Sequence, residues 1–372
     1  MGNTPLGWAA ENGHSEVVKL LLGRDDIDPN KPDEEGLTPL MLAADNGHEE
    51  VVKLLLGRDD IDLNKPDEEG QTPLMLAAWN GHEGVVKMLL RRDDVEPNTP
   101  DDDGRTPLYF AAGNGHEGVV EMLLARDDID PDTPDDYGQT PLYCAANNGH
   151  EQVVEMLLRR DDIDPNAPDD DGETPLYCAA RYGHEGVVEM LLAQDDIDPD
   201  KPDKAGQSPL CCAARYENEG VVNMLLGRND VDPNKPDNQG QTALLLVAQT
   251  GYEGTAKILL GWEEIDPNKA DDKGQTPLLL AAGYGNAELV KMLLERNDIN
   301  PNISSLDGKT PLYQAALNGH EDVVRILLRW DEVNPNYPNQ CCRTALSLAV
   351  RNVETHVIAL LQLRLAATHN PD

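Results

Sequence analysis

The sequence is poor in aromatic residues. It has one Phe, four Trp and ten Tyr among 372 residues, so a buried core must be made mainly from Leu, Val and Ala. It also lacks any run of about 18 apolar residues, the length that indicates a membrane-spanning helix. The N-terminus, Met1-Gly2-Asn3-Thr4, shows no signal-peptide pattern. We therefore expect neither a membrane-spanning helix nor a cleaved leader.

Basic residues are also few. Lys and Arg number 30 against 69 Asp and Glu, which gives a formal net charge of −39. Such a charge argues against DNA, RNA and anionic membranes as general partners. Part of it lies in ten successive linkers that carry an acidic or amide pair, from Asp25-Asp26 to Asp331-Glu332. We interpret these pairs as a solvated edge that keeps the chain soluble.

The six cysteines do not suggest a disulfide framework. Cys144, Cys178 and Cys212 occupy equivalent positions in successive copies of a repeated segment. Stacked helices lie about 8–10 Å apart, whereas a disulfide needs Cα atoms within about 7 Å. A reducing compartment, cytoplasm or nucleus, is therefore expected. Whether the adjacent pair Cys341-Cys342 is redox-active stays open.

One segment, from Thr38 to His48, recurs through the whole chain. It reads Thr-Pro-Leu-Met-Leu-Ala-Ala-Asp-Asn-Gly-His, and its copies start 34 residues apart without a slip in register. A repeat of this kind predicts stacked supersecondary units that form a solenoid. The aligned Thr or Ser positions are Thr4, Thr38, Thr72, Thr106, Thr140, Thr174, Ser208, Thr242, Thr276, Thr310 and Thr344.

Each repeat predicts two short helices and a projecting loop. Thr38 suits an N-cap, Pro39 suits the first helical position, and Gly47 suits the left-handed residue that ends a helix. A second amphipathic helix is predicted from residue 48 to residue 56. The next stretch, residues 59–70, contains Pro66, Asp67 and Gly70, so we expect it to end in a hairpin-like finger.

These motifs resemble the ankyrin repeat. Thr-Pro-Leu-x-x-Ala-Ala-x-x-Gly-His, then Val-Val-x-x-Leu-Leu and Asp-x-x-Gly, cover essentially the whole chain. The period of 34 and the linker Asp-Asp-Ile-Asp-Pro-Asn resemble the ankyrin arrays of filamentous fungi. The His usual after Thr-Pro-Leu in the family is replaced, for example by Met41 and Tyr109, which leaves open the hydrogen bond that it makes there.

The resemblance implies an all-α fold, an ankyrin-repeat solenoid of about eleven helix-turn-helix units with finger loops. We expect a single array over residues 1–367 and a disordered tail at 368–372. The repeats are expected at about 1–32, 33–66, 67–100, 101–134, 135–168, 169–202, 203–236, 237–270, 271–304, 305–338 and 339–367.

The resemblance also implies where a partner binds. In this family partners usually meet the concave face, formed by the finger tips and the last two residues of each first helix. The three tip positions of fingers two to six hold 14 acids out of 15. Tyr, Trp and Arg at these positions are interface-type residues. The resulting candidates are Glu34, Glu35, Glu68, Glu69, Trp79, Tyr137, Arg181, Tyr182, Arg215, Tyr216 and Tyr284.

No motif indicates catalysis or a resident metal. The Gly-His histidines, such as His48, are expected to bond backbone in the turn between helices. Asp26-x-Asp28-x-Asn30 begins like an EF-hand loop but has Lys31 where Gly is required. We therefore expect a monomeric, non-enzymatic protein-binding scaffold without cofactor or metal, whose partner protein carries a basic patch. The alternatives are the ligand-sensing C-terminal part of a larger fungal protein with an immune-type nucleotide-binding ATPase, and, less favoured, an acidic cation-binding solenoid.

Overall fold

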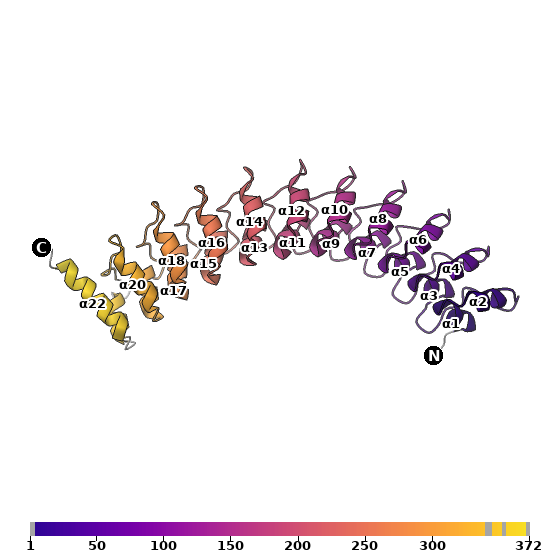
Figure 1. The fold of residues 1–372 in the computed structure, drawn as a ribbon, viewed down its shortest axis with the longest axis horizontal. Coiled ribbons are helices and arrows are strands. Elements are labelled where there is room, and N and C mark those ends of the chain that lie inside the picture. Colours follow the sequence, from indigo (N-terminus) through magenta and orange to yellow (C-terminus); the bar gives the residue numbers. More distant parts are fainter. Residues whose placement is uncertain (1–3, 339–343, 352–354, 370–372) are drawn as a thin grey trace. The chain divides into compact units, whose positions relative to one another are not determined.

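The computed structural model describes residues 4–338, 344–351 and 355–369, and within these ranges all regular structure is helical (Figure 1). Each repeat supplies a first and a second helix. The first helices are α1 (Pro5–Glu11), α3 (Pro39–Asp45), α5 (Pro73–Trp79), α7 (Pro107–Gly113), α9 (Pro141–Asn148), α11 (Pro175–Tyr182), α13 (Pro209–Arg215), α15 (Ala243–Thr250), α17 (Pro277–Tyr284), α19 (Pro311–Leu317) and α21 (Ala345–Arg351). The second helices are α2 (Ser15–Leu22), α4 (Glu49–Leu56), α6 (Glu83–Leu90), α8 (Glu117–Leu124), α10 (Glu151–Leu158), α12 (Glu185–Leu192), α14 (Glu219–Leu226), α16 (Glu253–Leu260), α18 (Ala287–Leu294), α20 (Glu321–Arg329) and α22 (Thr355–His369).

The first helices begin and end as the sequence predicts. In α3, the Met41 amide donates to Thr38 Oγ1 at 3.3 Å, and Pro39 occupies the first helical position. The Thr38 amide donates in turn to Met41 Sδ at 3.3 Å. Gly47 follows the C-cap Asn46 with φ +69°, a conformation that a residue with a Cβ adopts only with strain. Thr and Gly therefore fix the two ends of this short helix.

The core lies between successive repeats. Ala43 and Ala44 in α3 are fully buried, as are Val52 and Leu55 in α4. Neighbouring first helices pack on each other, for example α3 on α1 and α5, and second helices do the same. Small Ala side chains allow the first helices to approach closely, while Val and Leu fill the space between the second helices. Truncation of a buried side chain such as Leu55 to Ala would lower the free energy of unfolding by about 2–5 kcal/mol, because it would leave a cavity in this core.

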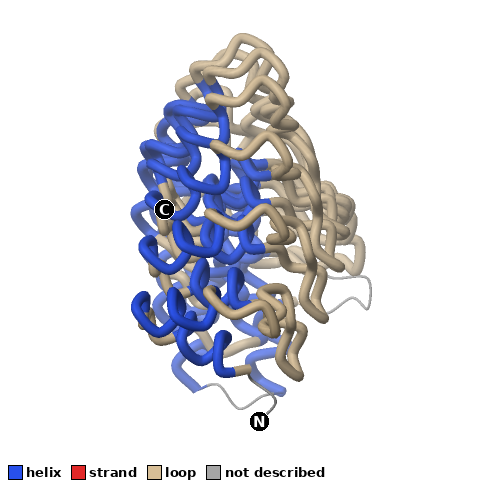
Figure 2. Tube along the Cα trace, turned by 90° about the vertical axis from the view of Figure 1, so that its right-hand side faces the viewer, coloured by secondary structure: helices blue, strands red, loops and turns tan. Residues whose placement is uncertain are grey.

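The described chain forms two compact units. The first comprises Met1–Ala179 with Glu189–Ile197, and the second comprises Ala180–Val188 with Asp198–Asp372. Within each unit the helices and the loops gather on different sides (Figure 2). The loops of each repeat are of two kinds: a linker that follows the second helix, and the finger that precedes the next first helix. Both kinds of loop are rich in acidic residues.

The last repeat differs from the expectation at its end. Helix α22 runs to His369, so residues 368 and 369 of the expected tail are helical. The rest of that tail, 370–372, lies outside the described residues, and so does the last finger with Cys341 and Cys342.

Candidate interaction surface

In most of the described fingers, an Asp at the first tip position holds the loop together. The amides of Tyr137 and Gln139 donate to Asp135 Oδ1 at 2.9 and 2.8 Å, and the Tyr109 hydroxyl donates to Asp135 Oδ2 at 3.0 Å. Asp135 is consequently only 7% exposed. The same amide bonds recur around Asp33, Asp67, Asp101, Asp169, Asp237 and Asp271.

The first tip position of a finger is therefore structural, and it differs from the two tip positions that follow it. The second and third tip acids are exposed, as the predicted candidates Glu34, Glu35, Glu68 and Glu69 are. We call the surface formed by these second and third tip residues and by the last two residues of each first helix the finger–helix face.

Successive fingers are joined through their backbones. The Asp136 amide donates to the Asp103 carbonyl at 2.9 Å, and the Leu306 amide donates to the Lys273 carbonyl at 2.9 Å. This row of backbone bonds links each tip to the next, while the second and third tip acids stay exposed. Equivalent bonds join Glu68 to Glu35, Asp102 to Glu69, Asp170 to Tyr137, Asn238 to Ala205 and Asp272 to Gln239.

Two of the tyrosines that follow Thr-Pro-Leu bond the next finger. Tyr109 bonds Asp135, and the Tyr143 hydroxyl donates to Asp169 Oδ2 at 2.9 Å. Burial and these neighbours raise the pKa of both phenols, so both remain protonated donors. In these two repeats a Tyr hydroxyl therefore supplies a hydrogen bond at the position where the family has His, whereas the Leu side chains at Leu245 and Leu279 have no polar group.

The Gly-His histidines bond backbone, but across repeats. His82 Nε2 lies 2.8 Å from the carbonyl oxygen of Asp45, the last residue of α3 in the preceding repeat. In repeat seven Asn218 stands in place of His, and its Nδ2 donates to the carbonyls of Ala180 and Arg181 at 2.8 and 2.9 Å. Like His82, the histidines His48, His116, His150 and His320 each bond a carbonyl of the preceding repeat.

The linker acids are only partly free. Arg58 donates from Nε and Nη2 to both carboxylate oxygens of Asp60 at 2.8 and 2.7 Å, which lowers the pKa of Asp60. Its Nη1 also donates to the Leu22 carbonyl of the preceding repeat at 3.0 Å. The second acid of a linker pair is exposed, as predicted, and it also orients an Arg that joins two repeats. The same pairs are Arg24–Asp26, Arg92–Asp94, Arg126–Asp128, Arg160–Asp162, Arg228–Asp230 and Arg296–Asp298.

An Asn in most linkers makes a second link between neighbouring repeats. Asn64 Nδ2 donates to the Asp94 carbonyl at 2.7 Å, and Asn64 Oδ1 accepts from the Glu96 amide at 2.9 Å. Both halves of one amide group are thus used by the next repeat. Asn30, Asn98, Asn234, Asn268 and Asn302 do the same.

Two linkers carry Asp where the others carry this Asn. Asp132 Oδ2 accepts from the Asp164 amide at 3.1 Å, but its buried Oδ1 has no partner. Asp200 repeats the pattern: Oδ2 accepts from the Asp232 amide at 2.7 Å, and Oδ1 is buried without a partner. Burial raises the pKa of Asp132 to about 6 and also raises that of Asp200. An ionised carboxylate cannot supply the donor that the Asn amide supplies.

The structure brings together three of the predicted anchor residues. The Arg181 guanidinium lies over the rings of Tyr182 and Tyr216, at 5.7 and 5.6 Å from their centroids. The two rings are 54% and 48% exposed. Arg215, the other candidate Arg, has no such ring contact among the described contacts, and its buried Nε has no partner. Tyr284 is exposed and no ring contact joins it to this cluster.

A second aromatic cluster includes residues that the sequence did not single out. Trp79, which was predicted, has its ring centroid 4.8 Å from that of Phe110. The Arg105 guanidinium lies 5.3 Å from the Phe110 centroid. Phe110 was missed because its position within α7 is a core position, although it is the only Phe of the sequence. Tyr137, the other predicted aromatic, stands exposed at a finger tip.

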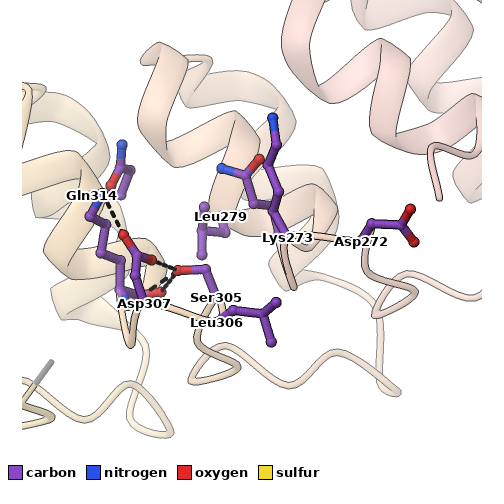
Figure 3. Close-up of a pocket in the computed structure, with 9 residues that line it drawn as sticks. Asp272, Lys273, Leu279, Ser305, Leu306, Asp307 and Gln314 are labelled. Carbon is purple, nitrogen blue, oxygen red and sulfur yellow. Dashed lines mark hydrogen bonds and ion pairs between the residues drawn. The ribbon is translucent and has the colours of Figure 1, made fainter. Parts of the chain in front are cut away.

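Two pockets on the finger–helix face occupy the same place in different repeats. One, of about 440 Å³, lies between repeats two and three and is lined by Leu42, Leu76 and the acids Glu35, Asp45 and Glu68, among others. The other, of about 410 Å³, lies between repeats nine and ten. There Lys273, Ser305, Leu306 and Asp307 surround the space (Figure 3). Both contain apolar side chains, but their charged residues differ.

Metal and redox chemistry gain no support from the part of the chain that the structure describes. No three His, Cys, Asp or Glu side chains there come together in a way that could hold a metal ion. Cys144, Cys178, Cys211 and Cys212 are buried free thiols. Burial raises the pKa of Cys144 to about 12 and that of Cys211 to about 11, so these thiols are poor nucleophiles. Among the described helices, none is both long and apolar enough to cross a membrane.

Comparison with known proteins supports the repeat assignment. A family model described as ankyrin repeats in three copies matches residues 6–101, 93–169, 163–237, 210–305, 244–339 and 297–370. No curated protein matches the chain in a sequence search. The overlapping matches extend over nearly all of the sequence and agree with the helix pairs, the Thr caps and the left-handed Gly residues described above. The chain therefore belongs to the ankyrin-repeat family.

Proposed function

We propose that the chain binds a partner protein, as a monomer, through the finger–helix face, which is the concave face in the family. Ankyrin repeats generally mediate protein–protein interaction, and proteins built from them are typically not enzymes. The observation that carries the proposal is the cluster of Arg181, Tyr182 and Tyr216. A guanidinium held over two half-exposed rings is a preformed contact of the kind found at binding hot spots.

The charge of the face supports a partner with a basic patch. The second and third tip residues of the first fingers are exposed acids, such as Glu34, Glu35, Glu68 and Glu69, whereas later fingers include Lys204 and Lys273. A basic surface approaching the early fingers would be steered by their field, and its association rate would fall as salt rises. Most of the affinity, however, is expected from the aromatic and Arg side chains.

The proposal is tested with a binder isolated against the full chain by affinity capture and then purified. Arg181→Ala combined with Tyr216→Ala should weaken its binding by about 2 kcal/mol or more, measured by calorimetry, because both sides of the stacked contact are lost. Arg325→Ala is the control, since Arg325 pairs with Glu321 along the surface of α20. Equal affinity of the double variant and the parent would contradict the assignment of this cluster.

A further inference from the structure

The pocket between repeats two and three combines an apolar floor with an acidic rim. Its floor includes Met41 and Leu42, which are 0% and 6% exposed, together with the half-buried Leu37 and Leu76. Its rim includes the exposed acid Glu35 and other carboxylates, and its lining contains no Lys or Arg. The rim acids are Glu35, Asp45, Asp67, Glu68 and Glu69.

Only part of this negative charge is used by the fold. Asp67 Oδ1 accepts from the amides of Glu69 and Gln71 at 2.9 and 2.8 Å, so Asp67 is used to hold its own finger together. Asp45 Oδ1 accepts from Asn80 Nδ2 at 2.9 Å, while the side chain remains exposed. Glu35 is likewise exposed at its fingertip. The pocket therefore offers carboxylates that can still bind a positively charged group.

The equivalent pocket between repeats nine and ten shows that the acidic rim is not required for folding. Lys273 stands there in place of Glu35, and Leu306 in place of Glu68. Lys309 Nζ lies 2.8 Å from Asp307 Oδ2, so part of the charge in that pocket is already paired. The pocket keeps its position and nearly its volume with two acids and two bases (Figure 3). Of these two pockets, only the one between repeats two and three has an excess of negative charge.

We propose that the pocket between repeats two and three binds one Arg or Lys side chain from an extended segment of a partner protein, with Arg preferred. This inference rests on the proposed function, because it specifies the chemistry of the partner. The methylene groups of the basic side chain would pack on Leu42 and Leu76, as such stems do on apolar surfaces. Its charged head would meet Glu35 and the other rim carboxylates. Arg is preferred because a planar guanidinium can donate two parallel hydrogen bonds to one carboxylate.

The size of the site also fits this occupant. A pocket of about 440 Å³ can hold a long side chain together with the backbone that carries it. A smaller cation alone would leave the floor of Leu and Met uncovered, and an apolar side chain would leave the rim charge without a partner. Only a side chain that is apolar along its stem and positive at its end satisfies both parts of the lining.

The test uses random ten-residue peptides displayed on phage and selected against the full chain. We expect the selected peptides to share one Arg or Lys. A synthetic selected peptide should lose about tenfold or more in affinity, measured by fluorescence anisotropy, when its Arg is replaced by citrulline. Citrulline keeps the shape of Arg but removes its charge, so this loss reports the charge and not the size of the side chain.

Two variants of the chain locate the peptide. Glu35→Lys copies the residue found at the equivalent site, Lys273, and should lower the affinity about tenfold or more. Asp59→Lys makes the same change of charge in the linker of repeat two and should alter the affinity less than about twofold. Equal losses with both variants, or selected peptides that contain no basic residue, would overturn the proposed basic-residue pocket.

The outcomes also separate this inference from the proposed function. If the peptides lose affinity with Arg181→Ala and Tyr216→Ala but not with Glu35→Lys, the finger–helix face binds proteins and the pocket assignment is wrong. If neither change affects any selected peptide, both proposals fail. A loss with Glu35→Lys alone supports the pocket as a separate binding site on the face.

Discussion

The linker of repeat two and the finger of repeat three use their polar side chains in different ways. In the linker, Asp60 fixes Arg58, and Asn64 bonds the next repeat through both atoms of its amide group. In the finger, Asp67 bonds two amides of its own loop, whereas Glu68 and Glu69 are exposed. The acids behind the net charge of −39 therefore include some that hold the array together and others that are exposed. Substitution of the first kind should lower the free energy of unfolding, whereas substitution of the second kind should change it little.

The largest effect is expected at the buried acid of a finger. Asp135→Ala removes the acceptor for the amides of Tyr137 and Gln139 and for the Tyr109 hydroxyl. Because these groups would lose their partner within a folded loop, the unfolding free energy should fall by about 3 kcal/mol, measured by urea denaturation. Asp136→Ala, the exposed neighbour, should change it by less than about 0.5 kcal/mol. Similar losses for the two variants would erase the distinction between the tip positions.

A smaller effect is expected at the linker Arg. Arg160→Ala removes the paired contact with Asp162 and the bond from Nη1 to the Leu124 carbonyl at 3.3 Å. We expect the array to lose about 1–2 kcal/mol of unfolding free energy. Arg159→Ala is a control one residue away, since Arg159 only pairs with Glu155 along the exposed surface of α10. That change should cost about 0.5 kcal/mol or less. If the two Arg changes had the same cost, the link to the preceding repeat would contribute nothing.

The smallest effect is a gain at Asp132, and it depends on pH. The pKa of this carboxyl in the folded chain, about 6, lies above the value of about 3.9 for an unfolded Asp. The folded state therefore holds the proton more tightly, and stability falls as pH rises from about 4 through 6. Asp132→Asn supplies the missing donor, so at pH 8 the variant should be about 1 kcal/mol more stable than the parent. The gain should shrink toward pH 4.

Thermal unfolding at several pH values measures this difference. The converse change, Asn98→Asp, should destabilise the chain at pH 8, because Asn98 Nδ2 donates to the Asp128 carbonyl at 2.5 Å. A gain of Asp132→Asn that is the same at pH 4 and pH 8 would show that ionisation of Asp132 is not its cause.

The sequence was sufficient to predict the fold because its signals are local. The Thr38 cap, the Pro39 start and the left-handed Gly47 each depend on a few neighbouring residues, and all three are confirmed. The burial of Leu55 likewise follows from helical periodicity. The equal spacing of these signals then predicts stacking, since each unit has an apolar side that only a neighbour can cover.

The candidate site could be predicted only in part. The exposed positions of Tyr182 and Tyr216 followed from the family pattern, but that pattern did not show that Arg181, and not Arg215, lies over their rings. Which Arg lies over a ring depends on side-chain rotamers and on how neighbouring repeats are displaced from each other. The spacing of residues along the sequence predicts neither. The role of Asp135 was missed for a similar reason, because consecutive acids in a finger look alike until the loop closes around one of them.

Departure from the repeat pattern does not by itself mean a lost contact. Asn218 stands where most repeats have His, yet it bonds two backbone carbonyls of the preceding repeat. Asp132 changes a single atom relative to the usual Asn and leaves a buried oxygen without a partner. A substitution weakens the array when the new side chain lacks a hydrogen-bond donor or acceptor that the neighbouring repeat needs, however similar the two residues are.

The bonds between neighbouring repeats have a consequence for changes in the number of repeats. His82 bonds the Asp45 carbonyl and Arg92 bonds the Leu56 carbonyl, each in the preceding repeat, and the middle repeats offer equivalent donors and acceptors at their other junctions. Deletion or duplication of one whole repeat would therefore bring matching groups together at the new junction. A change in the number of middle repeats by whole units would thus leave every junction with the donors and acceptors that it needs.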